Sequence, residues 1–437
     1  MTASYKGAIL SVLLMGVIFI SDSLSAQSLW QFSNKHKAKF EQIWLQDHHI
    51  PTTENGEGKI SAKDANGNDL ACYEMLYDRA VARPFTPGCH YLFEVPSKIL
   101  PAGSFVDFNA TFTIEDGAPM EWVLEVEDGG KWKICKSFMC YGPAFGKDDS
   151  HTYIYQTVRI EEGVENMIRF RIKASDGFMR PTKNKMEERG AMFVSGPHLG
   201  AMVKDFGSNA PKDTLKVLCL GNSFTYFYGC PTMLKEIAWN EGHFIDVNAS
   251  LKGGWNMGQH LSLQTTNDLI QEGGYDYMIL QDQSLVPAKV GRDPQGMYSK
   301  VKEMEAMATK VRTTSPDCKA IIENTWAYWK YNFGSFKSID DFDENGIKGS
   351  IILAEAVEDA QISPIANAFK IVREERPDIN LYDSDKHHQS VLGSYLKSCI
   401  NYLVLFGEPF GDSPADCLQD PEIAAYLRSV AERVVLN

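Results

Sequence analysis

The apolar run 215–220 ends at Gly221, and Ser223 stands two residues after this glycine. Five of the six residues in the run are apolar, which is typical of a strand buried on both faces. Gly221 permits a tight turn, and the apolar spacing over 230–240 predicts a helix after it. A serine at such a corner is lifted out of the sheet, beside N–H groups that can receive an anion. The alternative is that Ser223 is only a helix N-cap.

Asp385 and His388 form the second group of residues that could do chemistry. A carboxylate three residues before a histidine can reach Nδ1, which leaves Nε2 free to take a proton from a serine. We expect Asp385 to favour the imidazolium and so to hold the pKa of His388 above its ordinary value near ~6.5. Ser390 is a plausible N-cap for the apolar run 391–406. The alternative for the neighbouring pair His387 and His388 is an exposed polar loop.

The elements that must position these residues alternate between strand-like and helix-like segments. The strands are expected over 215–220, 244–251, 277–280, 319–324 and 380–382. The helices between them include 259–271, 297–313 and 365–374. This alternation predicts an α/β fold with a parallel sheet covered by helices on both faces. Functional groups of such folds gather beyond the carboxyl ends of the strands, which places Ser223, Gly253, 281–284, 325–326 and 385–388 on one rim.

The motif Gly221-Asn222-Ser223-Phe224, followed by Asp385-x-x-His388, resembles the SGNH (GDSL-like) hydrolase superfamily. The resemblance covers roughly residues 215–407. It implies a three-layer α/β/α parallel sheet and a triad of Ser223, His388 and Asp385. It also implies that no metal or cofactor is needed.

The same resemblance implies an oxyanion hole made by residues after the second and third strands. Gly253 is the expected backbone donor, with Gly254 as the alternative. Gln283 falls where the family has an asparagine donor, and its side chain is one methylene longer. Asn222 replaces the family's usual aspartate. Among the aromatic residues after strand ends, Trp255 and Trp326 are the expected substrate-binding residues, and Tyr328 and Trp329 follow the same strand as Trp326.

The resemblance implies a serine esterase, and by analogy with the family we expect a carbohydrate esterase that removes O-acetyl groups from glycans. Its partner is a glycan or another ester substrate. The alternative is an SGNH-fold carbohydrate-binding protein that has lost activity, which the departure at 281–283 motivates. The string Gly411-Asp412-Ser413 matches the GDS motif more literally, but it follows no strand and no Asp-x-x-His comes after it, so it reads as a loop. No G-x-S-x-G elbow occurs.

The N-terminal half has a different sequence pattern. Residues 1–26 read as a signal peptide, with Lys6, an apolar stretch and small residues before the cleavage point, so the protein is expected in the periplasm or outside the cell. No stable membrane insertion is expected after cleavage, and a retained anchor is the alternative. Residues 27–206 alternate apolar and polar positions in short runs, which predicts an antiparallel β-sandwich, possibly carbohydrate-binding. Trp122 and Trp132 are either sugar-binding or core residues.

The polar stretch 207–213 is the expected boundary, and 213–437 is the SGNH-like domain. A formal net charge of −14 argues against a nucleic-acid partner, which would need a basic surface. The nine cysteines include no CxxC pair, so their spacing gives no support to a zinc site.

Overall fold

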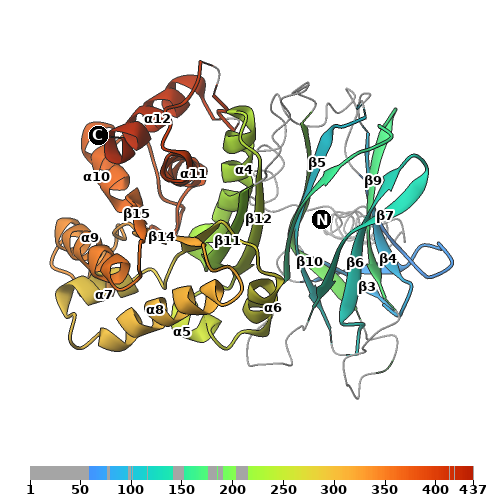
Figure 1. The fold of residues 1–437 in the computed structure, drawn as a ribbon, viewed down its shortest axis with the longest axis horizontal. Helices are drawn as coiled ribbons and strands as arrows, with labels where there is room; N and C mark the ends of the chain where they lie inside the picture. The colour runs from blue at the N-terminus through green and yellow to red at the C-terminus, as the bar shows by residue number, and fades with distance from the viewer. Residues whose placement is uncertain are drawn as a thin grey trace, which may run out of the picture.

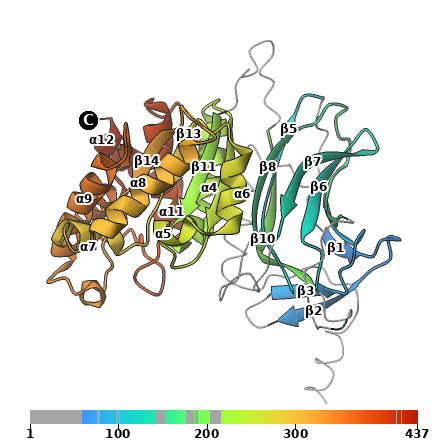
Figure 2. The same ribbon diagram turned by 60° about the horizontal axis from the view of Figure 1, so that its bottom comes forward.

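The computed structural model describes residues 59–75, 79–96, 100, 102–115, 117–140, 152–175, 185, 190–202, 215–412, 414–417 and 419–436. The expected signal peptide and the expected boundary at 207–213 lie outside these residues. In Figures 1 and 2 the antiparallel strands of the N-terminal half lie beside the helix-covered sheet of the C-terminal half. None of the helices in the described ranges combines the length and apolar character that a membrane crossing requires.

The N-terminal half contains two five-stranded sheets in which every pairing is antiparallel. The first has the order β1 (Lys59–Lys63), β4 (His90–Pro96), β9 (Met167–Ala174), β6 (Glu121–Asp128) and β7 (Lys131–Met139). The second has the order β2 (Ala71–Met75), β3 (Arg79–Arg83), β10 (Ala191–Met202), β5 (Phe105–Ile114) and β8 (Thr152–Arg159).

Aromatic side chains from both sheets meet in one buried core. The rings of Phe108 and Phe170 lie 5.2 Å apart, and those of Phe112 and Trp122 lie 4.6 Å apart. Trp122 is thus a core residue, whereas Trp132 lies outside this core with the Arg171 guanidinium 4.3 Å from its ring centre. Alternate residues of β9 are buried, as expected for a strand with one face on a core.

The C-terminal half is built on five parallel strands. Their order is β12 (Ile245–Leu251), β11 (Leu215–Gly221), β13 (Tyr277–Leu280), β14 (Lys319–Glu323) and β15 (Gln361–Ser363). Strand β11 shows why both faces need helices. Val217 and Cys219 join one hydrophobic cluster, while Leu218 and Leu220 join another on the opposite face. The result is a three-layer α/β/α arrangement.

Helices of the C-terminal half cover the two faces of this sheet (Figure 1). The cluster on one face includes residues of α4 (Cys230–Asn240), α10 (Ile365–Glu375), α11 (Val391–Phe406) and α12 (Pro421–Val435). The cluster on the other includes residues of α5 (Met257–His260), α6 (Gln264–Glu272), α7 (Val286–Arg292), α8 (Tyr298–Arg312) and α9 (Ile339–Glu355).

Two expected elements are corrected. The helix expected over 259–271 is divided into α5 and α6, because the chain turns at Leu261–Leu263, where the buried His260 hydrogen-bonds both Thr266 and the Gly221 carbonyl. The strand expected over 380–382 is only an isolated bridge between Tyr382 and Gln389. The fifth strand is β15, whose three residues are too short to show a periodic pattern.

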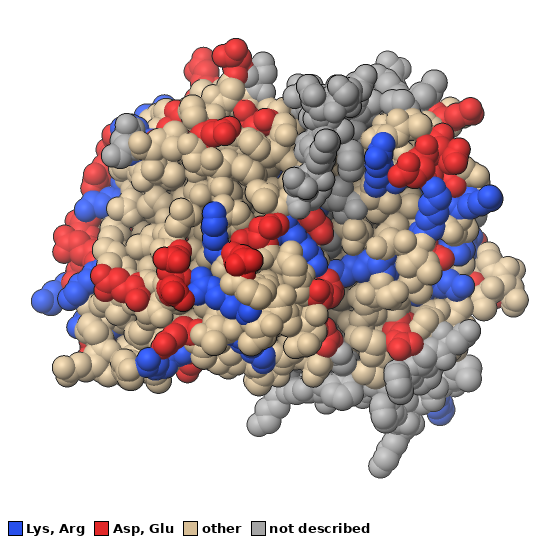
Figure 3. Space-filling view, in the orientation of Figure 1, with Lys and Arg blue, Asp and Glu red and all other residues tan. Residues whose placement is uncertain are grey.

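On the face drawn in Figure 3, acidic and basic side chains are interspersed rather than gathered by sign.

Candidate active site

The turn between β11 and the next helix presents Ser223 at the sheet edge. Helix α3 (Ser223–Tyr226) begins at the serine, and Asn222 is its N-cap, with Oδ1 accepting a hydrogen bond from the Phe224 N–H at 3.1 Å. The capping role therefore belongs to Asn222, which leaves the Ser223 hydroxyl available. Gly221 is needed because a Cβ there would come within 2.8 Å of the Gln281 side chain.

The loop before α11 brings a histidine and a carboxylate to this serine. His388 Nε2 lies 2.7 Å from Ser223 Oγ, and His388 Nδ1 lies 2.6 Å from Asp385 Oδ2. Asp385 Oδ1 accepts the backbone N–H groups of His387 and His388, each at 3.0 Å, which fixes the carboxylate in the loop. These are the contacts of a nucleophile, a general base and a residue that orients the base.

His387 has a different place from His388. Its Nδ1 lies 3.3 Å from the other oxygen of Asp385, and its ring is 4.1 Å from that of His388. Asp385, His387 and His388 also bring ligand-type atoms within 4.8 Å of one another, so they are the group among the described residues that could hold a metal ion. Since His388 Nε2 faces Ser223, the observed contacts are those of proton transfer.

The surroundings of His388 settle the direction of its pKa. Phe227 stacks on the imidazole with ring centres 4.1 Å apart, and the His388 side chain is only 15% exposed. Burial lowers the pKa of His388, and the hydrogen bond to Asp385 only partly offsets this. The expectation of a raised pKa is therefore wrong, because it considered the carboxylate without the burial of the ring.

Asp385 has the protonation state that this pairing requires. Burial alone would raise its pKa, but hydrogen bonds from the His387 backbone and from His388 outweigh burial and lower it. An ionised carboxylate beside a neutral imidazole is the arrangement in which a histidine can accept a proton at neutral pH.

The expected oxyanion donors follow strand residues that are paired side by side in the sheet. Leu220 of β11 pairs with Ser250 of β12 on one side and with Leu280 of β13 on the other. Ser223, Gly253 and Gln283 each follow three residues after that row. A Cβ on Gly253 would come within 3.0 Å of the Tyr226 hydroxyl, so this glycine lies close to α3.

These donors have N–H groups that an oxyanion could accept. Neither the Ser223 N–H nor the Gly253 N–H donates a hydrogen bond to any described residue. Gln283 Oε1 accepts the Leu285 N–H at 3.0 Å, and its Nε2 has no partner within the described part of the chain. Gly254, the alternative donor, has φ +75° in the turn that follows.

Of the expected substrate-binding aromatics, Trp255 and Trp326 have different outcomes. Trp255 is partly exposed in the loop after Gly253, with the Lys252 ammonium 4.7 Å from its ring centre. Trp326 is fully buried, its ring stacked on Phe369 at 4.4 Å and on Phe224 at 4.6 Å.

The assignment of Trp326 to substrate binding is therefore wrong. Its Nε1 donates to the His387 carbonyl at 3.0 Å, so it supports the loop that carries the histidine. Tyr328 is buried as well, whereas Trp329 is 55% exposed, and its N–H donates to the Lys386 carbonyl at 3.0 Å.

Sequence reasoning placed 281–284 on the rim but gave Gln281 no role, and it missed Gln389. Gln281 Oε1 accepts the Asn222 N–H at 2.9 Å and the Thr225 hydroxyl at 3.0 Å. Gln389, next to His388, donates from Nε2 to the Phe224 carbonyl at 3.0 Å. A polar residue directly after an apolar strand was the available signal for Gln281. Gly411 and Asp412 of the competing string lie in the loop after α11, and Ser413 is outside the described residues.

The sequence matches no protein-family model and no curated protein. It is similar to solved structures. One is a DUF4886 family protein from Bacteroides uniformis, 17% identical, covering 51% of this chain and 95% of that chain, with a TM-score of 0.43.

Another is a carbohydrate esterase family 2 enzyme with a carbohydrate binding domain from Corynascus thermopiles (Myceliophthora fergusii), 12% identical over 74% of this chain and 95% of that one, TM-score 0.34. A third is an acetylxylan esterase from Geobacillus stearothermophilus, 18% identical over 46% and 97%, TM-score 0.34. Likeness of this degree transfers neither an activity nor a substrate.

Proposed function

We propose that this protein is a serine ester hydrolase. The observation that carries the proposal is the chain of two hydrogen bonds, 2.7 Å from Ser223 Oγ to His388 Nε2 and 2.6 Å from His388 Nδ1 to Asp385 Oδ2. Nucleophile, base and orienting carboxylate are thus joined in the order that acyl transfer requires.

In the proposed reaction, Ser223 Oγ attacks the ester carbonyl carbon while its proton moves to His388 Nε2. The carbonyl oxygen becomes an oxyanion, which the Ser223 and Gly253 N–H groups and the Gln283 Nε2 stabilise. When this intermediate collapses, the C–O bond to the alcohol breaks and the alcohol takes the proton from His388. Water then attacks the acyl-serine while His388 takes its proton. The bond to Ser223 Oγ breaks, the serine regains the proton from His388, and the carboxylic acid is released.

Hydrolysis of p-nitrophenyl acetate by wild type and Ser223→Ala tests this. We expect the variant to lose turnover by on the order of 10⁴-fold or more. Ser262→Ala is the matched control, because this serine is exposed and bonds only the Gln259 carbonyl. Wild-type turnover in Ser223→Ala would remove Ser223 as the nucleophile. Failure of wild type to hydrolyse any ester would favour the alternative, an inactive protein that binds carbohydrate.

We further propose that the esters are O-acetyl groups on glycans. The support is Trp329, whose exposed ring is on the segment that hydrogen-bonds Lys386 in the middle of the Asp385–His388 loop. Large exposed aromatic faces beside a reactive group suit the apolar face of a sugar ring. Export through the signal peptide at 1–26 would place the enzyme where such glycans occur, and the partly exposed Trp132 of β7 would let the N-terminal half bind the same polymer.

Trp329→Ala tests the glycan assignment. We expect KM for acetylated xylan to rise in this variant. The kcat/KM for p-nitrophenyl acetate should stay close to wild type, since this small ester has no sugar ring to bind the Trp329 ring. Tyr298→Ala is the matched control, because Tyr298 is similarly exposed (57%) but lies on α8. Equal losses on both substrates would show that Trp329 supports the histidine loop and does not bind sugar.

A further inference from the structure

Phe224 follows Ser223 directly and lies in a very short helix. Its main-chain carbonyl needs a hydrogen-bond donor from outside that helix. Helix α3 has only four residues, and the chain then kinks at Tyr228, which has φ +54°. The last carbonyls of a helix have no intrahelical donor and need other groups to satisfy them. The orientation of the peptide between Phe224 and Thr225 therefore depends on donors from elsewhere in the fold.

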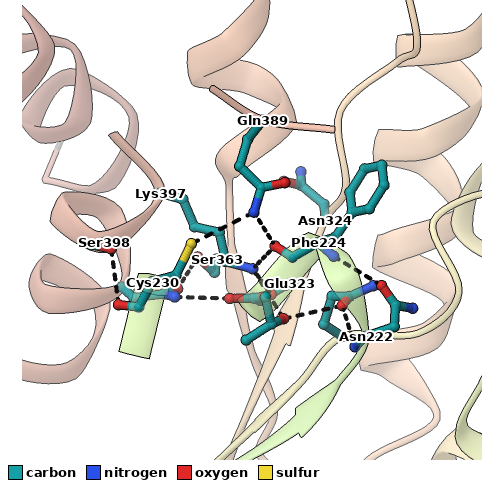
Figure 4. A network of polar contacts seen from close by, with 12 residues as sticks. Asn222, Phe224, Cys230, Glu323, Asn324, Ser363, Gln389, Lys397 and Ser398 are labelled. Carbon is teal, nitrogen blue, oxygen red and sulfur yellow. Dashed lines mark hydrogen bonds and ion pairs between the residues drawn. The ribbon is translucent and has the colours of Figure 1, made fainter. Parts of the chain in front are cut away.

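Lys397, from the middle of α11, supplies one of these donors (Figure 4). Its Nζ donates to the Phe224 carbonyl at 2.8 Å, to the Thr225 hydroxyl at 3.2 Å and to Glu323 Oε2 at 2.6 Å. An ammonium group has three N–H donors, and each has a partner here. Two of the three partners belong to the nucleophile turn.

Glu323 holds the ammonium in place from the end of β14. Its second oxygen accepts Asn401 Nδ2 at 2.8 Å, and Asn401 Oδ1 accepts the Ser363 hydroxyl at 2.7 Å. The side chains of Lys397 and Glu323 are each only 1% exposed. A buried ion pair is weak evidence for stability, because an apolar pair of similar volume is often as stable or more so. Its contacts with the turn that carries Ser223 point to a role other than stability.

We propose that the buried Lys397–Glu323 pair is a positioning device for the nucleophile, which rests on the proposed esterase function. The pair ties the turn to β14 and α11, while Gln281 ties the same turn to the end of β13 through Asn222 and Thr225. The backbone around Ser223 is thus bonded on both sides, and the Ser223 hydroxyl itself is left to His388. Neither charged side chain touches the reacting atoms, so each acts through the turn.

Thr225 gives the sharpest test, because its hydroxyl is the branch point between Lys397 and Gln281. Thr225→Val keeps the shape and removes the hydroxyl, whereas Thr225→Ser keeps the hydroxyl. We expect Thr225→Val to lower kcat for p-nitrophenyl acetate by roughly 10-fold or more with little change in KM, since small misplacement of a nucleophile can cost on the order of 100-fold. Thr225→Ser should restore most of the turnover. Equal losses in the two variants, or no loss in either, would overturn the proposal.

The double variant Lys397→Met with Glu323→Gln tests the pair itself. Methionine keeps the length of the lysine chain, and glutamine keeps an acceptor for Asn401. We expect it to fold and to lose kcat by roughly 10- to 100-fold at unchanged KM. The acid limb of its pH–rate profile should stay in place, because the removed pair is neutral as a whole. Wild-type kcat in the folded variant, or a displaced limb, would contradict a positioning role.

The matched control is the double variant Arg428→Met with Asp416→Asn. It removes a different ion pair, the one that joins α12 to the loop before it. It should keep wild-type kcat. Amide hydrogen exchange over residues 222–229 gives a readout that does not need activity. We expect faster exchange there in the Lys397/Glu323 variant than in wild type or the control. If wild type hydrolyses no ester, the proposed function fails while exchange still decides whether the pair orders the turn.

Discussion

At the scale of single residues, the neighbouring histidines have separate environments. His388 Nε2 faces Ser223 Oγ, and its ring is covered by Phe227. The His387 side chain is more exposed, and its Nδ1 lies 3.3 Å from Asp385 Oδ1. Lys386, between Asp385 and the two histidines, has the left-handed conformation with φ +67°, and the loop turns at this residue. One residue of the pair is thus placed to accept the serine proton.

The first prediction concerns the pH dependence of turnover. A general base must be neutral, so the rate should fall as pH drops through the pKa of His388. Because burial lowers that pKa, the acid limb should lie below the ordinary histidine value of ~6.5. A pH–rate profile of kcat/KM for p-nitrophenyl acetate measures it. A limb above that value would contradict the inferred burial effect.

Variants of the two histidines check the same assignment. His388→Ala should nearly eliminate turnover, and Asp385→Asn should lower it by on the order of 10⁴-fold by favouring the wrong tautomer. His387→Ala is the control and should leave most activity. The reverse outcome, with His387→Ala inactive and His388→Ala active, would shift the general base by one residue.

Gln283→Ala is the second prediction. Its Nε2 is the side-chain donor of the proposed oxyanion hole, and loss of an oxyanion donor typically costs ~10²–10³ in turnover. We expect kcat to fall with little change in KM, because the oxyanion forms only in the transition state. Gln264→Ala, an exposed glutamine on α6, is the control. An unchanged kcat in Gln283→Ala would leave the hole with backbone donors alone.

At the scale of elements, Asp282 joins the loops that follow three adjacent strands. Its Oδ1 accepts the Met257 N–H at the start of α5 at 3.1 Å and the Gln283 N–H at 2.6 Å. Its main-chain carbonyl accepts Asn222 Nδ2 at 3.3 Å. Oδ2 is buried and receives no hydrogen bond from the described residues, and burial raises the pKa of Asp282 to about 7. The loops around the candidate oxyanion hole therefore share one carboxyl group.

The third prediction follows from that raised pKa. An acid whose pKa is raised on folding binds its proton more tightly in the folded state, so its contribution to stability is present below pH ~4 and is lost as pH rises to about 7. Asp282→Asn does not titrate. Relative to wild type, its free energy of unfolding should improve between pH 4 and 8 by on the order of a few kcal/mol.

Urea unfolding of both proteins at pH 4.5 and pH 8 measures this difference. Asparagine places an unpartnered Nδ2 at the position of Oδ2, and that cost is the same at both pH values, so only the change with pH is informative. Parallel stability curves for the two proteins would contradict the raised pKa.

At the scale of the whole molecule, the two halves meet at β7 and β8 on one side and β12 and α6 on the other. Lys136 Nζ of β7 donates to Asn248 Oδ1 of β12 at 2.8 Å, and lies 3.4 Å from Glu272 of α6. A cavity of about 210 Å³ lies beside this contact, lined by residues of both halves such as Phe138 and Leu269. Asn248 is 3% exposed, so this hydrogen bond is largely shielded from water.

The fourth prediction concerns Lys136→Met. Loss of a donor to a buried amide costs roughly 1–3 kcal/mol, while the Glu272 contact is partly exposed and adds little. We expect faster amide hydrogen exchange in β8 and β12 and unchanged turnover of p-nitrophenyl acetate. Lys133→Met on the same strand is the control, because its partner Asp128 lies in the N-terminal half. Equal exchange changes in both variants would show that Lys136 does not couple the halves.

Several features were predictable because they depend on short stretches of sequence. An apolar run before Gly221 predicts a buried strand and a turn, and β11 and α3 are found there. The runs 104–108, 122–126 and 168–172 alternate apolar and polar residues, and they correspond to β5, β6 and β9. Periodicity and turn residues act over a few positions, so the sequence alone determines where these strands and turns form.

Other features were decided only by the tertiary structure, because they depend on neighbours far away in sequence. Trp326 and Trp329 are three residues apart, yet packing against Phe224 and Phe369 buries the first and leaves the second exposed. The lowered pKa of His388 depends on burial that the motif itself does not contain.

Lys397 and Glu323 carry no motif, and a lysine in a helix or a glutamate after an apolar run normally reads as a solvent-exposed side chain. Only the packing of α11 over the end of β14 brings the two charges together beneath Ser223. The sequence by itself determined the types of residue at the turn and in the loop before α11. The fold determined their distances, exposure and protonation, because each of these is a property of contacts between elements.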